Sequence, residues 1–502
     1  MNLLYSLINR LIEISIDNKL IEPLDEIYVR NRLLSAFNEC NYSEISKLST
    51  NFSETLEQLT GIAVDNGIIN DYLHEKDIFS SNLMNCFLDK PSVINKNFKG
   101  LYKNSPAAAT DYFYNLSKNS NYIKMDRIAK NAFFKTPSIY GDIDITINLS
   151  KPEKDSKQIA LEKNVVRGNY PKCLLCRENE GYDGTITHPD RGNHRTISLD
   201  INNKAWRLQY SPYVYYNEHC IVLLDEHEPM HVSKETFKTL LSFVEVFPHY
   251  FLGSNAGLPI VGGSILAHEH YQGGNYIFPM NRAKNLFSFK LKKYDNIEIT
   301  ALQWPLSTLR LRCKNVDDLV ECGGYIFDAW QNYSDEDHHI LASTEGNPHN
   351  AITPICRKED EYYIMDLALR NNRTTKDFPD GIFHPHKDVQ HIKKENIGLI
   401  EVMGLAILPG RLKTELEDIK NFILCNDKTA EENFSKIVAY HKPWAIELKE
   451  KYNSDVEINR FIEINIGNKF VRVLEDAGVF KQTPHGIDGF KKFADTIGAM
   501  YL

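Results

Sequence analysis

The spacing of apolar residues changes once along this chain, and that change constrains the fold more than any other feature of the sequence. Up to about residue 113, apolar side chains recur at intervals of three and four residues, as in residues 3–12 and 29–37. From about residue 136, short segments such as residues 143–147 and 206–210 alternate apolar with polar side chains. We therefore predict a helical N-terminal region followed by half-buried strands between turns.

Further elements can be assigned from the same patterns. Ser233 is a suitable N-cap for a helix that carries Phe237, Leu240 and Phe247 on one face. The pattern also predicts two strands, at residues 259–261 and 362–369, a largely apolar helix over residues 396–407, and a mainly helical tail over residues 413–502.

Length and composition indicate a folded protein with two or three units. The chain has 502 residues, of which 42% are hydrophobic and 25% charged, as in ordinary globular domains. No run of about 18 apolar residues suggests a membrane span. Polar residues interrupt the first helix, which argues against a signal peptide, and nine irregularly spaced cysteines fit reduced thiols. We expect a cytoplasmic protein that does not bind membranes.

The net charge of −9 gives no support to a nucleic acid partner, which would require a basic surface. Basic residues do gather locally, around Lys124, Arg191 and Lys393. Each of these groups could bind a phosphate. For any one of them taken alone, however, a solvent-exposed surface without a ligand is the more common explanation.

Cys173 and Cys176 form a C-x-x-C pair, whose tight turn can direct two thiolates at one zinc ion. No second pair follows at the spacing of a zinc finger, so further ligands would come from distant residues, with His219 and His268 the best candidates. From these residues alone, a zinc site and a pair of buried cysteines without a metal both stay open.

The segment from Pro259 to Asn275 contains the densest group of reactive side chains. His268, His270 and Gln272 stand at alternate positions and would share a face if the segment is extended. Glycine pairs at residues 262–263 and 273–274 would let the backbone approach a bulky ligand.

Two metal-site motifs fit this segment poorly. A zincin needs a second histidine where Gln272 stands, and a cupin needs a carboxylate where Gly274 and Asn275 stand. A neutral histidine can instead attack an activated phosphate, with Gln272 and the backbone N–H groups near Gly263 and Ser264 as donors to the phosphoryl oxygens.

Five long segments resemble the hexose-1-phosphate uridylyltransferases, in particular their longer class II form from Gram-positive bacteria. One of them reads G-G-S-I-L-A-H-E-H-Y-Q-G-G. The five are Tyr140–Asp155, Tyr170–Tyr182, Ser211–Val222, Gly262–Gly274 and Phe383–Gly404.

This resemblance implies an α+β fold with two histidine-triad-like halves built on antiparallel sheets, plus a helical N-terminal region and a helical C-terminal tail. The domains we expect are residues 1–113, 114–300 and 301–502. A homodimer is compatible with the sequence, which does not require one.

The implied reaction is a double displacement in galactose metabolism. A histidine takes the uridylyl group from UDP-glucose and releases glucose 1-phosphate, and galactose 1-phosphate then accepts the group to form UDP-galactose. The resemblance makes His270 the nucleophile, with Gln272 orienting the phosphate. It makes zinc the expected structural metal. The implied zinc ligands are Cys173, Cys176, His219 and His268.

The substrate contacts are predicted from position more than from motif, and involve Asn255, Gly263, Ser264, Lys393 and Lys394. Glu269 departs from the shorter class, which has proline between the two histidines. A second metal in the C-terminal half could involve His349, His384 and His386, and we leave that site open. The alternative functions are a related nucleotidyl hydrolase or phosphorylase, and a non-enzymatic binding protein whose fold is stabilised by zinc.

Overall fold

The computed structural model describes the chain except for residues 1, 44–46, 151–167, 264 and 426–428. The chain divides into two compact units that interleave along the sequence. The first unit contains residues 1–130, 150–214 and 218–227, and the second contains residues 131–149, 215–217 and 228–502. The three domains expected from the sequence stay a prediction.

The first unit begins with a bundle of helices, as the apolar spacing predicted. Leu7, Ile8 and Leu11 of the first helix are fully buried in its core. The third helix has a capping box in which Asn51 and Glu54 each accept the other's backbone N–H. The helices are α1 (Asn2–Asp17), α2 (Glu26–Ala36), α3 (Phe52–Asp65), α4 (Leu73–Asn85), α5 (Pro91–Tyr102), α6 (Pro106–Asn119) and α7 (Met125–Ile128).

Three antiparallel strands follow in the first unit. They are β3 (Ile197–Ile201), β4 (Lys204–Tyr210) and β5 (Cys220–Leu224), with β4 pairing to both of its neighbours. Tyr210 of the central strand is fully buried, and its hydroxyl donates to the backbone oxygen of Thr110 in α6. The strands therefore pack on the helices of the same unit.

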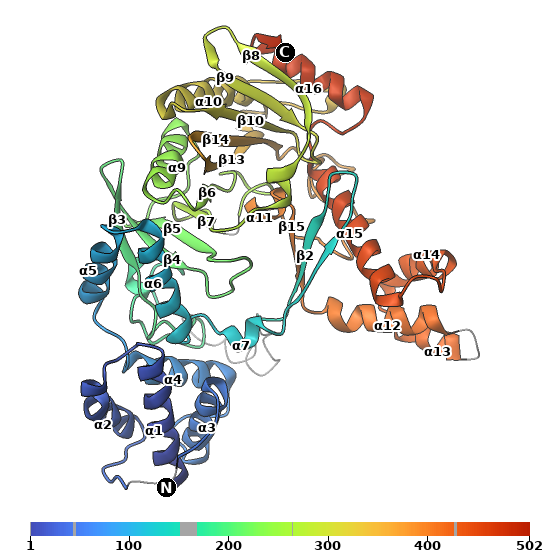
Figure 1. The fold of residues 1–502 in the computed structure, drawn as a ribbon. Coiled ribbons are helices and arrows are strands. Elements are labelled where there is room, and N and C mark those ends of the chain that lie inside the picture. The colour runs from blue at the N-terminus through green and yellow to red at the C-terminus, as the bar shows by residue number, and fades with distance from the viewer. Residues whose placement is uncertain (1, 44–46, 151–167, 264, 426–428) are drawn as a thin grey trace. The chain divides into compact units, whose positions relative to one another are not determined.

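The second unit is built on a long antiparallel run of strands (Figure 1). Its order is β16-β8-β9-β10-β14-β13-β6-β7. The strands are β6 (Phe251–Gly253), β7 (His270–Gly274), β8 (Asn285–Leu291), β9 (Tyr294–Leu302), β10 (Thr308–Cys313), β13 (Asn350–Glu359), β14 (Tyr362–Asn371) and β16 (Ala499–Tyr501).

Two helices, α9 (Lys234–Val246) and α10 (Val316–Gln331), pack on this run and on each other. Phe237 of α9 meets Phe327 of α10 edge-on, with ring centroids 5.8 Å apart. Ser233 caps α9 as expected, in a capping box with Thr236. Antiparallel sheets with helices on them confirm the α+β prediction.

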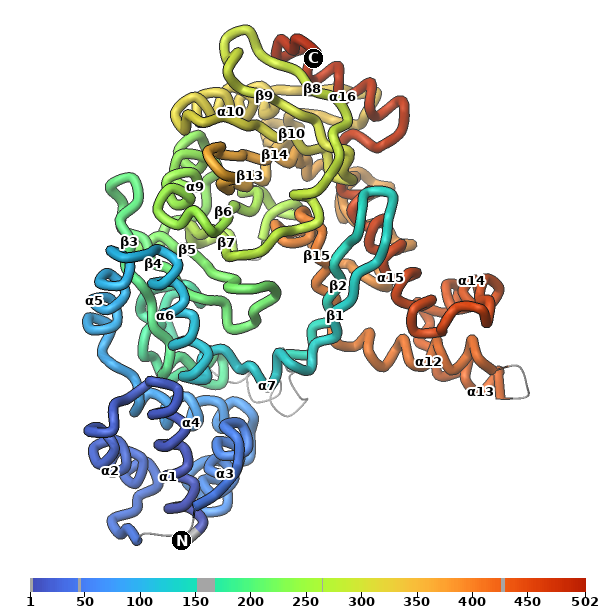
Figure 2. The backbone as a smooth tube through the Cα atoms, viewed as in Figure 1, coloured from blue at the N-terminus to red at the C-terminus, as the bar shows by residue number. Residues whose placement is uncertain are grey.

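A smaller sheet contains the hairpin of β1 (Ala132–Thr136) and β2 (Ile143–Asn148), with β15 (Leu405–Pro409) parallel to β2 (Figure 2). A separate short hairpin joins β11 (Ser343–Thr344) to β12 (Asn347–Pro348). The tail is helical as predicted, apart from β16. Its helices are α12 (Leu412–Leu424), α13 (Thr429–Lys436), α14 (Lys442–Lys451), α15 (Ile458–Ala477) and α16 (Pro484–Thr496). No helix within the described ranges is long and apolar enough to cross a membrane.

The helix predicted over residues 396–407 is wrong. Only α11 (Leu399–Val402) is helical, and β15 starts at Leu405. Gly404 separates them at a φ of +95°, and a Cβ there would lie 2.8 Å from the Trp304 ring. An apolar run without alternation fits a buried strand as well as a helix, and pairing with β2 decided this one.

The strand predicted over residues 259–261 is also wrong, because those residues form a turn. Ile260 has a φ of +72°, a left-handed conformation that no strand contains. Val261 is nevertheless buried, and it packs in a small apolar cluster with Ala256 and Ala351.

A buried ion network ties three strands of the second unit together. Asp366 of β14 is fully buried and accepts two hydrogen bonds from Arg310 of β10, at 2.7 and 3.0 Å. It accepts a third, at 2.7 Å, from Arg357 of β13. Burial raises the pKa of this carboxyl, but the two guanidinium groups outweigh burial and hold the pKa below its usual value.

Asp366→Asn should destabilise the second unit, because the buried guanidinium group of Arg357 and the half-buried one of Arg310 would lose their shared counterion. We expect a loss of about 3–5 kcal/mol in the free energy of unfolding, measured by urea denaturation at pH 7. The control is Glu361→Gln, which breaks an exposed ion pair with Lys314 and should cost less than about 1 kcal/mol. Equal losses in the two variants would contradict the assignment.

Candidate active site and metal-binding group

The strand β7 places two predicted site residues on one face. His270 and Gln272 are two positions apart in the strand, while Tyr271 points to the other face. Gln272 pairs with Gly253 of β6, and Gly274 pairs with Phe251. His268 is buried but precedes the strand, so alternation along β7 applies to His270 and Gln272 alone.

The ring of His270 is fixed by a local hydrogen bond. Its Nδ1 donates to the backbone oxygen of His268 at 2.7 Å. That bond places the proton on Nδ1 and leaves a lone pair on Nε2. Burial lowers the pKa of His270 to about 4, and the backbone bond only partly opposes this effect. The imidazole is therefore neutral at pH 7, which is the nucleophilic form.

Gly262 and Gly263, which precede this strand, lie where the chain packs against itself too closely for a Cβ atom. A Cβ on Gly262 would lie 2.3 Å from the backbone oxygen of Ala256. A Cβ on Gly263 would lie 2.6 Å from Nδ2 of Asn255. Asn255 is buried, and its side-chain oxygen accepts the backbone N–H of Leu399 at the start of α11. Ser264, the next predicted contact, lies outside the described residues.

The two predicted lysines differ in their surroundings. Lys393 is buried, and its ammonium group donates to Glu401 at 2.9 Å and to the backbone oxygen of Ile407 at 3.2 Å. It therefore already has protein partners in the second unit. Lys394 is exposed.

The C-x-x-C segment of the first unit forms the expected tight turn. The amide N–H of Cys176 donates to the backbone oxygen of Cys173, and Asn179 Nδ2 donates to the oxygens of both cysteines. The two sulfur atoms are 3.4 Å apart. The turn thus directs both thiols to one point.

His227, which the sequence prediction missed, completes this group in the first unit. Its Nδ1 lies 3.0 Å from Sγ of Cys176, and the ligand atoms of Cys173, Cys176 and His227 all lie within 4.8 Å of one another. Sulfur ligands of a tetrahedral zinc ion are about 3.8 Å apart, so the group could hold a metal ion. Burial, followed by the neighbouring Cys173 thiol, raises the pKa of Cys176, and a bound cation would favour the thiolate instead.

His219 is not part of this group among the described residues. It is buried immediately before β5, and its backbone oxygen accepts the N–H of Ser211. His227 follows the end of the same strand by three residues. The sequence feature that could have identified His227 as a candidate ligand is its position just after a buried strand, where a loop can turn back toward the cysteines.

The histidines considered for a second metal form no such group in the described part of the chain. Both ring nitrogens of His349 have partners, in Asn372 and Thr344. His386 contacts the backbone oxygen of Ile382 at 3.0 Å and the Asp476 carboxylate at 3.4 Å.

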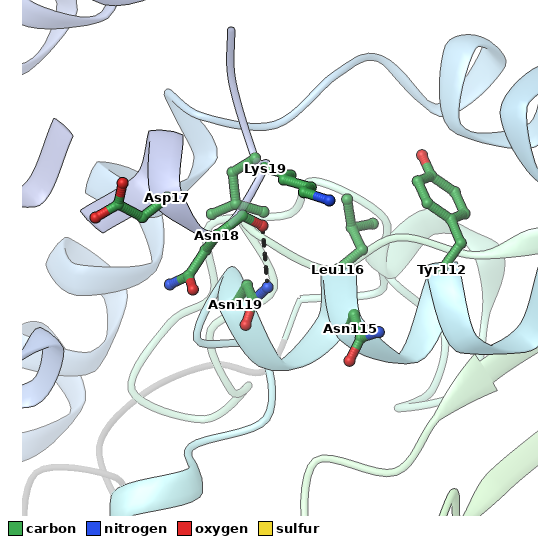
Figure 3. Close-up of a pocket in the computed structure, with 8 residues that line it drawn as sticks. Asp17, Asn18, Lys19, Tyr112, Asn115, Leu116 and Asn119 are labelled. Carbon is green, nitrogen blue, oxygen red and sulfur yellow. Dashed lines mark hydrogen bonds between the residues drawn. The ribbon is translucent and has the colours of Figure 1, made fainter. Parts of the chain in front are cut away.

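The surface pockets of the first unit include two of similar size. One, of about 400 Å³, is lined by α1 and α6 and contains none of the predicted site residues (Figure 3). Asn119 at its edge donates to the backbone oxygen of Asn18. The other, of about 390 Å³, is lined by Leu174 and by basic residues that include Lys124. Lys124 is paired there with Asp77 and Asp190, so the local charge is largely balanced.

Comparison with known proteins gives extensive matches. Sequence models of the galactose-1-phosphate uridyl transferase N-terminal and C-terminal domains match residues 19–229 and 243–446. A galactose-1-phosphate uridylyltransferase of Clostridium perfringens is 58% identical over 99% of both chains. Proteins of the same name from Clostridium acetobutylicum and Streptococcus pneumoniae are 48% and 47% identical, each over 98% of this chain and 99% of the relative.

Among solved structures, yeast Ap4A phosphorylase Apa2 is 13% identical, with a TM-score of 0.35 over 65% of this chain and 90% of that one. A TM-score this low supports no conclusion about the fold or function of this chain. The sequence matches span nearly the whole chain and include the strand with His270 and the C-x-x-C turn. This chain belongs to the galactose-1-phosphate uridyl transferase family.

Proposed function

We propose that this protein exchanges the uridylyl group between UDP-glucose and galactose 1-phosphate. The observation that carries this proposal is the 58% identity to a galactose-1-phosphate uridylyltransferase over 99% of both chains. At that level and coverage, the substrates of the relative are the substrates we assign here. The products would be glucose 1-phosphate and UDP-galactose.

His270 is the proposed nucleophile. In the first step, its Nε2 lone pair attacks the α-phosphorus of UDP-glucose, an N–P bond forms, and the bond to the oxygen of glucose 1-phosphate breaks. In the second step, a phosphate oxygen of galactose 1-phosphate attacks the same phosphorus and releases the imidazole. Support comes from the Nδ1 hydrogen bond, which leaves Nε2 as the free lone pair, and from burial, which keeps the ring neutral.

Gln272 is proposed to orient the phosphate. It shares the face of β7 with His270, and its amide can donate to a non-bridging oxygen on which charge grows during transfer. A neutral amide suits both steps, because it attracts the phosphoryl oxygens without competing as a nucleophile.

The metal is proposed to be zinc, held for structural reasons. Two thiolates and an imidazole are the ligands that zinc prefers, and the fourth ligand in this proposal is His268, which the resemblance assigns. We replace His219 by His227 in the proposed set, because His227 lies with the cysteines. Bound zinc would keep both sulfurs as thiolates and hold the turn closed.

Other parts of the sequence prediction stay predictions. They include substrate contacts of Asn255, Gly263, Ser264, Lys393 and Lys394, a homodimer, and a location in the cytoplasm. Of these residues, Lys394 is the exposed cation, whereas Lys393 is engaged by Glu401.

His270→Ala should lower turnover by about 10⁴-fold or more, because no other group replaces the nucleophile. The wild type should exchange labelled glucose 1-phosphate into UDP-glucose without any galactose 1-phosphate, and should carry a uridylyl adduct that the variant lacks. The control His349→Ala alters a ring whose nitrogens bond to Asn372 and Thr344, and should keep full activity. Consumption of UDP-glucose by water or inorganic phosphate, without exchange, would instead indicate a hydrolase or phosphorylase.

Gln272→Ala should lower kcat by about 10²–10³-fold, as expected for the loss of a donor to a developing negative charge. Gln272→Glu should lower it further, since a carboxylate would repel the phosphate. Steady-state kinetics with both substrates measure this effect. Equal activity of the Glu and Gln forms would contradict a role for Gln272 as a donor.

The metal proposal predicts about one zinc per chain by elemental analysis. His227→Ala should lose most of that zinc and lower the melting temperature, because the thiols would lose a ligand partner. His219→Ala is the matched variant and should retain the zinc. The reverse result would restore His219 to the ligand set.

A further inference from the structure

Glu269 lies between the two histidines of the site in sequence. Its carboxylate, however, accepts its hydrogen bonds on the side of the chain opposite to the ring of His270. Its Oε1 accepts the hydroxyl proton of Tyr271 at 2.6 Å. Its Oε2 accepts the backbone N–H of His231 at 2.8 Å. Tyr271 is buried and points to the face of β7 opposite to His270, so Glu269 is bound on that opposite face.

The loop that Glu269 binds is itself held in place. The backbone N–H of Met230 donates to Leu266 at 2.9 Å, and the N–H of Glu269 donates to the oxygen of Glu228 at 2.6 Å. The backbone oxygen of His231 accepts the hydroxyl of Thr236, in the first turn of α9. Residues 228–231 are therefore hydrogen-bonded both to the segment before β7 and to the first turn of α9, a helix whose inner face is buried.

The peptide group between residues 268 and 269 joins this clamp to the reactive ring. Its N–H, from Glu269, donates to Glu228, and its oxygen, from His268, accepts the Nδ1 proton of His270. A peptide group is planar, so the direction of its N–H sets the direction of its oxygen. Rotation of this peptide would withdraw the acceptor that holds the proton on Nδ1.

We propose that Glu269 is a positioning residue for His270: by clamping the loop of residues 228–231 and Tyr271, its carboxylate fixes the peptide that selects the reactive ring tautomer. This inference rests on the proposed role of His270 as nucleophile. The hydroxyl of Tyr271 and the N–H of His231 are charge-assisted donors to the carboxylate, and such bonds are stronger than neutral ones. Because both donors lie away from the reacting face, the negative charge is kept from the incoming phosphate.

The test compares Glu269→Ala and Glu269→Gln with Tyr271→Phe. Glu269→Ala should lower kcat about 100-fold with little change in KM, because the nucleophile is misplaced while the substrate contacts remain. Glu269→Gln keeps an oxygen acceptor and should recover at least about one tenth of the wild-type kcat. Tyr271→Phe removes one of the two bonds and should fall between the wild type and Glu269→Ala.

Two readouts separate positioning from a general loss of structure. Tyr140→Phe removes a similar bond, from a buried tyrosine to the carboxylate of Glu475 in the same unit, and should leave kcat unchanged. Nitrogen-15 NMR of labelled histidine should show the Nδ1–H tautomer of His270 in the wild type and in Glu269→Gln, and a mixture of tautomers in Glu269→Ala.

An unchanged kcat in folded Glu269→Ala, or an equal loss in Tyr140→Phe, would overturn the inference. Failure of the proposed function would look different, because the wild type itself would then show no exchange of glucose 1-phosphate and no adduct on His270.

Discussion

The hydrogen bond from His270 Nδ1 to the backbone oxygen of His268 is the interaction on which the proposed chemistry depends. It is short, it lies within three consecutive residues, and it joins a side chain to the backbone that precedes its own strand. Because it occupies Nδ1, the lone pair of the ring is on Nε2. Burial keeps the ring uncharged, so one bond and one environment together leave a neutral imidazole with its lone pair on Nε2 at neutral pH.

Several charged groups that are buried in the second unit are paired. Asp366 joins β10, β13 and β14 through two arginines, and Lys393 with Glu401 joins the turn before α11 to the β15 backbone. Glu269, which is half-buried, likewise has a hydroxyl and an amide as donors to its carboxylate. A buried charge without partners would destabilise the fold by several kcal/mol. Pairing thus allows the second unit to bury charged groups without that loss of stability.

Local patterns predicted the elements that form locally. The apolar spacing of residues 3–12 placed α1, and Ser233 placed the start of α9, because helical periodicity and capping depend on neighbours within four residues. The same reasoning failed at residues 396–407, where Gly404 and pairing with β2 divide an apolar run into a short helix and a strand. It failed at residues 259–261, where a buried Val261 lies in a turn.

The sequence by itself determined the candidates for the proposed chemistry: the C-x-x-C pair, and the histidine and glutamine at alternate positions of one strand. These depend on residue type and on spacing of two or three positions, which the chain specifies directly. Only the tertiary structure brought His227 to the cysteines and left His219 outside the group, since either histidine is about fifty residues away from them. It also gave Glu269 its partners. A carboxylate next to the proposed nucleophile in sequence can point to either face, and the fold of the loop before α9 decides which.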